Sequence, residues 1–220
     1  METIYGNLQG LKTSQIKQLQ RLYHQRLPGD RLATSEFAQR LAAISTDLNQ
    51  PVCVYVNRRG QVIRVGVGTP RQTQIPPLEL PRYGAERLSG IRCIATQLKL
   101  DPPSESTLTA MAIQRLDALV ALTLTGGGFE RRGGGATGYV KETYLAHLVP
   151  HPETAWTVSP PLSLDVVTNQ DFSSLVEGLE EEFRREYTAR QVDRAQDQVL
   201  IVGLMTDNTT AARFQSDLAE

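Results

Sequence analysis

The stretch that decides the fold reads Arg87-Leu88-Ser89-Gly90-Ile91-Arg92-Cys93-Ile94-Ala95-Thr96-Gln97, followed by Pro102-Pro103-Ser104 and Arg115-Leu116-Asp117-Ala118. Its apolar part, from Ile91 to Ala95, predicts a strand. Ser104 or Ser106 is expected to cap a helix, which buries Leu108, Met111, Ala112 and Leu116. The next run, 118–124, is apolar at almost every position, which is typical of a central strand covered on both faces. This order of strand, helix and strand predicts an α/β fold.

Strands are also expected on both sides of this stretch. Residues 52–56 and 61–67 flank Asn57-Arg58-Arg59-Gly60, which predicts a hairpin with glycine at the left-handed turn position. Another strand is expected from Tyr139 to Val149. Together these elements predict a mixed sheet in an α/β sandwich over residues 51–150.

The rest of the chain has three segments with different sequence patterns. Residues 1–50 predict a helical pair, with helix starts near Thr13 or Ser14 and near Thr34-Ser35. Residues 151–197 predict a connecting segment whose amphipathic helix starts near 169–171. Residues 198–220 predict a strand and the start of a helix, which together form a truncated βα unit.

Composition excludes several classes of function. The 220 residues carry a formal net charge of −1, so neither DNA nor an anionic membrane is expected as a partner. No apolar run approaches the roughly 20 residues of a membrane span, and the N-terminus lacks the features of a signal peptide. Two cysteines make no disulfide framework. We therefore expect a soluble cytoplasmic protein.

A catalytic metal is not expected. Zinc catalysis requires about three nitrogen, sulfur or carboxylate ligands. The chain has three histidines (His24, His147 and His151) and two cysteines (Cys53 and Cys93). No two histidines have the spacing of a metal motif, and both cysteines lie in apolar, strand-like runs where burial is usual.

Four motifs occur in an order that resembles the N-terminal extension of some HflX-type GTPases: Tyr5-Gly6-Asn7, the Arg59-Gly60 hairpin, Gly90-Ile91-Arg92-Cys93-Ile94 and Arg115-Leu116-Asp117-Ala118. Residues 198–220 resemble the start of the HflX N-terminal domain. In many members of that group a strand ends in His-x-His-Pro and a helix starts with Ser-x-x-Asp, as in JAMM/MPN-type zinc hydrolases and RadC. By this resemblance Ala95 and Gln97 occupy the histidine positions, Leu98 the proline and Thr107 the aspartate. The resemblance thus implies a degenerate JAMM-like domain without metal ligands.

The glycine-rich segment, 126–138, does not match a nucleotide-binding loop. Gly133 and Gly138 have the GxxxxG spacing, but Tyr139 and Val140 follow where a P-loop requires Lys and then Ser or Thr. A P-loop also opens a helix, whereas a strand is expected here. The segment is predicted to be a long mobile loop between strands, with Arg131 and Arg132 as possible contacts to RNA or an anion.

Two readings of function remain. The resemblance implies a non-catalytic accessory region, with no cofactor of its own, of a GTPase that binds GTP and Mg²⁺ and associates with the large ribosomal subunit. The alternative is a stand-alone hydrolase or small-ligand-binding domain of JAMM-like descent. Its polar groups near the motif would be Ser89, Ser104, Thr107 and Asp117, but serine and threonine without a neighbouring base are poor nucleophiles. Asp117 is expected to be a cap or turn residue.

Overall fold

The computed structural model describes residues 2–69, 71–78, 87–125, 129–130, 136–137, 139–151 and 153–193. Residues 1–187 form one compact unit, and residues 188–220 form a second. The predicted βα unit of residues 198–220 and the side chains of Arg131 and Arg132 lie outside the described residues.

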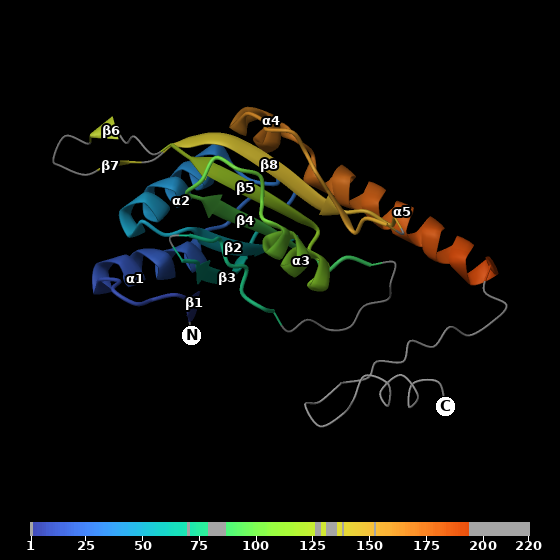
Figure 1. Ribbon diagram of the computed structural model, residues 1–220, viewed down its shortest axis with the longest axis horizontal. Helices are drawn as coiled ribbons and strands as arrows, with labels where there is room; N and C mark the ends of the chain where they lie inside the picture. The colour runs from blue at the N-terminus through green and yellow to red at the C-terminus, as the bar shows by residue number, and fades with distance from the viewer. Residues whose placement is uncertain are drawn as a thin grey trace, which may run out of the picture. The chain divides into compact units, whose positions relative to one another are not determined.

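The centre of the first unit is a seven-stranded mixed sheet (Figure 1). The strand order is β1-β3-β2-β4-β5-β8-β9, and the pairs β1/β3 and β4/β5 are parallel. The strands are β1 (Ile4–Gly6), β2 (Val52–Asn57), β3 (Val62–Val67), β4 (Ile91–Gln97), β5 (Ala118–Leu124), β8 (Val140–Leu148) and β9 (Trp156–Val158). This sheet confirms the predicted α/β class, the hairpin and the central strands.

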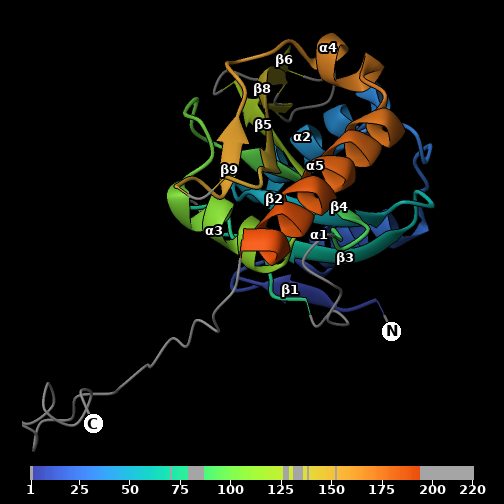
Figure 2. The same ribbon diagram turned by 90° about the vertical axis from the view of Figure 1, so that its right-hand side faces the viewer.

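Helices cover both faces of this sheet (Figures 1 and 2). They are α1 (Thr13–Gln20), the 3-10 helix η1 (Arg21–His24), α2 (Ser35–Leu48), α3 (Glu105–Ile113), α4 (Leu164–Asn169) and α5 (Phe172–Asp193). One core joins α1, η1 and α2 to side chains such as Val54 and Val120. The other joins α3 to the opposite face, where Cys93 and Leu119 lie. Helix α5 contributes to both cores and closes the sandwich.

The segments that the sequence analysis distinguished therefore share one folded unit as far as Tyr187. In the main sheet and the helices around it, three short elements were not predicted: β1, β9 and α4. Helix starts were predicted well: Thr34 caps α2, Ser104 caps α3, and α5 starts at Phe172. Within the described residues, no helix is both long and apolar enough to cross a membrane.

Two glycines of the sequence motifs are required by close backbone contacts. Gly6 has φ +92°, and a Cβ there would lie 2.0 Å from the Val67 carbonyl oxygen. Gly60 has φ +80°, and a Cβ there would lie 1.7 Å from the Leu27 carbonyl oxygen. Only glycine fits such positions without backbone movement. These motifs therefore hold β1 and the hairpin in place.

The glycine-rich segment differs from its prediction as a loop. Strands β6 (Phe129–Glu130) and β7 (Ala136–Thr137) pair antiparallel within it, in a sheet separate from the main one. The segment holds seven glycines and two arginines and shows no alternation of apolar and polar residues, so it does not indicate these two-residue strands. Strand β8 follows at Val140, so the segment leads into a strand as predicted.

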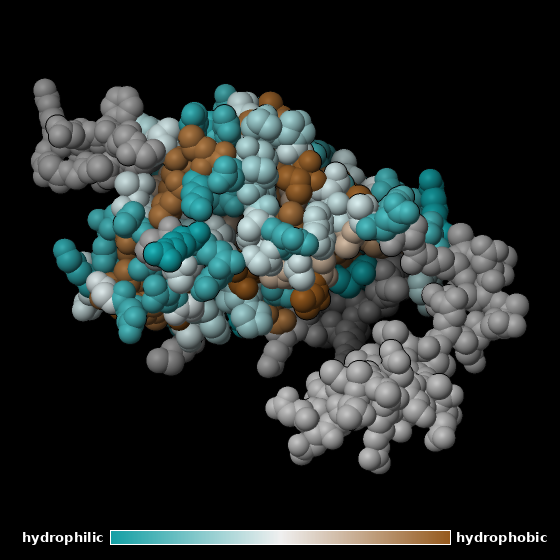
Figure 3. Space-filling model, viewed as in Figure 1, coloured by the Kyte–Doolittle hydropathy of each residue, from teal (hydrophilic) through white to brown (hydrophobic). Residues whose placement is uncertain are grey.

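The surface seen in Figure 3 mixes hydrophilic and hydrophobic residues. Exposed apolar side chains in the described part of the chain include Ile63, Leu100, Ile113 and Val166, which belong to separate elements or loops. Scattered apolar side chains of this kind are normal for a protein surface.

Candidate functional site

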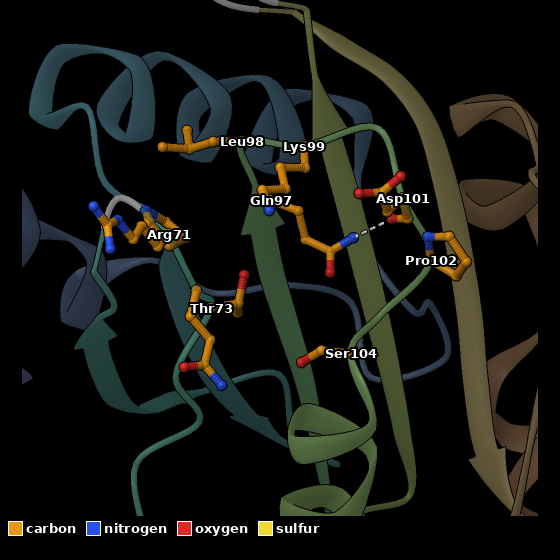
Figure 4. Close-up of a pocket in the computed structure, with 10 residues that line it drawn as sticks. Arg71, Thr73, Gln97, Leu98, Lys99, Asp101, Pro102 and Ser104 are labelled. Atoms are coloured by element: carbon orange, nitrogen blue, oxygen red, sulfur yellow. Dashed lines mark hydrogen bonds between the residues drawn. The ribbon is translucent and has the colours of Figure 1, made fainter.

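The candidate site lies where β4 ends and α3 begins. Ligands of open α/β sheets usually bind outside the carboxyl ends of parallel strands, and β4 pairs in parallel with β5. A half-open cavity of about 160 Å³ lies at this edge (Figure 4). Its lining comprises Pro51, Arg71, Gln72, Thr73, Gln97, Leu98, Lys99, Asp101, Pro102 and Ser104. We call it the β4–α3 pocket.

Only some of the positions that the resemblance assigns to metal ligands lie at the β4–α3 pocket. Gln97 lines the β4–α3 pocket, and its Nε2 donates to the Asp101 carbonyl oxygen at 2.9 Å (Figure 4). Ala95 lies two residues earlier on the same face of β4 but is 1% exposed and belongs to the core. Thr107 is buried in the first turn of α3, with its Oγ1 2.9 Å from Ser104 Oγ. Gln97 and Ser104 thus line the pocket, while Thr107 lies behind Ser104 and Ala95 is covered.

The hydroxyl groups at the start of α3 bind one another and the preceding loop. Ser104 Oγ accepts a hydrogen bond from the Thr107 backbone N–H, as the predicted cap requires. It also lies 3.0 Å from Ser106 Oγ, which accepts from Gln72 Nε2 at 2.7 Å. Thr73 Oγ1 donates to the Thr96 carbonyl oxygen at 3.0 Å. This network ties residues 72–73 to α3 and β4.

The lining of the β4–α3 pocket carries more positive than negative side chains. Arg71 and Lys99 supply two positive charges, and Asp101 supplies one negative charge. In the part of the chain that the structure describes, no histidine, lysine or carboxylate side chain hydrogen-bonds to the Ser104 hydroxyl. Without such a base a serine is a weak nucleophile. Arg71, Thr73 and Lys99 were not identified from the sequence. Residues 71 and 73 belong to a proline-containing loop that is distant in the chain from the end of β4 and the start of α3.

The residues considered as metal ligands are dispersed. His24 ends η1 and lies 2.9 Å from Glu2, His147 lies in β8, and His151 follows that strand. Over the described ranges there is no group of three His, Cys, Asp or Glu that could hold a metal. Cys53 and Cys93 are buried, as predicted. Burial raises the pKa of the Cys53 thiol to about 12 and also raises the pKa of Cys93.

Asp117 lies in the bend immediately before β5, which agrees with the expected turn residue, but it also forms an ion pair that was not predicted. It is fully buried, its Oδ2 accepts from Arg58 Nε at 2.7 Å, and its Oδ1 accepts from the Gly90 N–H at 2.8 Å. Burial raises the pKa of Asp117, and the hydrogen bond from Arg58 opposes that rise. No local pattern indicates these contacts, because Arg58 and Gly90 lie 59 and 27 residues away from Asp117.

No family model matches the chain, and no curated protein or solved structure is significantly similar to it. A functional proposal therefore rests on the resemblance of the sequence motifs together with the fold class and the site geometry.

Proposed function

We propose that this chain is the non-catalytic N-terminal accessory region of an HflX-type GTPase. The full-length protein would bind GTP with Mg²⁺ in the cytoplasm and associate with the large ribosomal subunit. The basis is the ordered resemblance of four motifs, together with the side chains at the junction of β4 and α3. GTP binding would belong to the G domain, because Tyr139 and Val140 stand where a P-loop requires Lys and Ser or Thr.

The side chains at the β4–α3 junction are the observation that supports a non-catalytic role for this region. A zinc hydrolase needs imidazole and carboxylate ligands around an open coordination position. Here the corresponding positions hold a buried methyl group at Ala95, an amide at Gln97 bonded to its own loop, and a hydroxyl at Thr107 bonded to Ser104. These groups stabilise the loop and the helix start, which supports a structural role for the junction.

Calorimetric titration with GTP and Mg²⁺ tests this assignment. We expect no binding heat up to about 100 µM GTP, because a dissociation constant in the micromolar range needs about −8 kcal/mol of contacts. Micromolar affinity would contradict the proposal. The reading frame beyond Glu220 tests the family assignment. Continuation into a Gly-rich loop with Lys-Ser supports the assignment. Continuation through a domain without that loop contradicts the assignment.

A ribosome experiment separates this region from the G domain. Full-length protein and a version without residues 1–190 are sedimented with large ribosomal subunits. GTP hydrolysis by the shortened protein should stay within about twofold, since this region supplies no catalytic group, while its co-sedimentation or ribosome-stimulated activity changes. Loss of intrinsic hydrolysis in the shortened but folded protein would contradict the accessory role.

A second candidate is a small-ligand-binding domain of JAMM-like descent. The β4–α3 pocket favours it, because Arg71, Lys99 and Ser104 all belong to its lining. A ligand screen followed by thermal unfolding tests it. The candidate gains support if a ligand stabilises the native chain and Arg71→Ala abolishes this effect while Arg59→Ala preserves it. Equal effects in both variants would remove this candidate.

A further inference from the structure

A second cavity lies at the opposite ends of the same two strands, near the starts of β4 and β5. Its volume is about 480 Å³, and its polar lining comprises Arg58, Arg87, Ser89, Gly90, Glu180 and Arg184. We call it the arginine pocket. It combines the hairpin turn, the segment before β4 and the middle of α5, so residues distant in the sequence form one concave surface.

The walls of the arginine pocket are fixed by hydrogen bonds. The Arg58 N–H donates to the Gly90 carbonyl oxygen at 3.2 Å, and the Ser89 N–H donates to the Arg115 carbonyl oxygen at 2.8 Å. Behind them, buried Asp117 binds both Arg58 Nε and the Gly90 N–H. A pocket whose backbone is fixed in this way loses little conformational freedom when a ligand binds.

Positive charge exceeds negative charge on the pocket lining. Three guanidinium groups face one carboxylate, that of Glu180. Arg58 donates through Nε to Asp117 and through Nη2 to Glu180 at 2.6 Å, which uses two of the five donors of a guanidinium. Arg87 is exposed, and Arg184 also binds Glu181. Three donors of Arg58 and the exposed guanidinium of Arg87 therefore remain at the lining for an oxyanion.

Ser89 adds a buried hydroxyl to this lining. The residue is 8% exposed, and its Oγ has no hydrogen-bond partner within the described residues. Buried hydroxyl groups nearly always have a partner, and an unsatisfied one costs about 1–3 kcal/mol. Ser89 thus brings an unsatisfied hydroxyl to the lining of the arginine pocket.

We infer that the arginine pocket binds the phosphate group of a small phosphate ester. Arginine forks match phosphate with paired hydrogen bonds, and a phosphate offers more acceptor oxygens than a carboxylate. The cavity has room for an organic group beside the phosphate. A small ligand is favoured over an RNA backbone, because RNA binding uses extended basic surfaces and this chain has a net charge of −1. The inference is independent of the GTPase assignment.

Titrations with inorganic phosphate and with AMP, followed by amide NMR shifts, test the inference. We expect saturable binding with a dissociation constant of about 1 mM for phosphate and tighter binding for AMP. Arg87→Ala should weaken AMP binding about fivefold or more by removing a charged donor. Glu180→Gln should tighten it about threefold, because a competing negative charge is lost. Opposite effects of these two variants distinguish binding from a purely structural role.

Arg185→Ala is the matched control. Arg185 lies on α5 and pairs with Glu181, but it does not line the arginine pocket. Its removal should change AMP affinity less than about twofold. Thermal unfolding verifies the fold of each variant, and Arg87→Gln replaces Arg87→Ala if the latter does not fold. The inference is overturned if neither small probe saturates, or if Arg87→Ala and Arg185→Ala weaken binding equally. It is also overturned if an eight-nucleotide RNA binds while phosphate and AMP do not.

Discussion

Arg92 is fully buried in β4, although arginine is rarely buried without a carboxylate partner. Its guanidinium donates to the carbonyl oxygens of Pro28, Leu32 and Asn57 at 2.9–3.1 Å and lies 4.7 Å from the ring centre of Phe172. Burial lowers the pKa of Arg92 to about 10. The side chain therefore joins the turn after η1, the end of β2 and the start of α5.

Arg92→Lys should lower the free energy of unfolding by about 2–4 kcal/mol. A lysine keeps the charge but cannot reach three carbonyl oxygens with one planar group, and each buried acceptor left without a donor is costly. Urea unfolding measures the change. Arg59→Lys, at an exposed turn position, is the control and should change stability by less than about 0.5 kcal/mol. Equal stability of both variants would contradict this role of Arg92.

The two cysteines give a prediction on reactivity. The thiolate is the reactive form, and burial raises the pKa of Cys53 to about 12 and raises that of Cys93 as well. A thiol stays neutral at every pH below its pKa, so both thiols are neutral at pH 8. Ellman's reagent at pH 8 should therefore label neither thiol of the native protein within minutes. Both should react in guanidinium chloride. Rapid labelling of a native thiol would show that the α3 face of the sheet is open.

Individual elements were predictable where the signal was local. The β2–β3 hairpin follows from a turn with glycine between apolar runs. Strand β5 follows from a run that is apolar at almost every position, and all seven of its residues are buried in the structure. Strand β1 has three residues and pairs with β3 about 60 residues later, so no local pattern shows it. The same applies to β9, which is also three residues long. These short strands depend on the sheet edge that they join.

Two glycine substitutions test the hairpin at the scale of an element. Gly60→Ala should lower the free energy of unfolding by about 2 kcal/mol or more, because alanine disfavours positive φ and its Cβ would meet the Leu27 carbonyl oxygen. Gly178→Ala in α5 meets no atom within 4 Å and should raise stability by up to about 1 kcal/mol, since alanine favours helix. Chemical unfolding compares them. The same sign for both changes would contradict the account of the turn.

At the scale of the whole molecule, β4 and β5 carry the β4–α3 pocket at their carboxyl ends and the arginine pocket at their amino ends. The resemblance to HflX-type extensions brought Gln97, Ser104 and Thr107 together around the end of β4. It did not indicate Arg71, which lines the pocket, or the Arg58–Asp117 pair, because the tertiary fold brings these residues into place, the pair across 59 residues. The Arg58–Asp117 pair shows how a motif residue can serve the scaffold rather than chemistry.

We propose that the β4–α3 junction resembles a metal site that lacks its ligands. Elemental analysis of the purified chain, loaded with zinc and then dialysed without chelator, tests it most directly. The triple variant Ala95→His, Gln97→His and Thr107→Asp, with its fold checked by thermal unfolding, is the positive control for zinc uptake. The account predicts less than about 0.1 zinc per native chain, because a site needs about three ligands. About one zinc per native chain would contradict it.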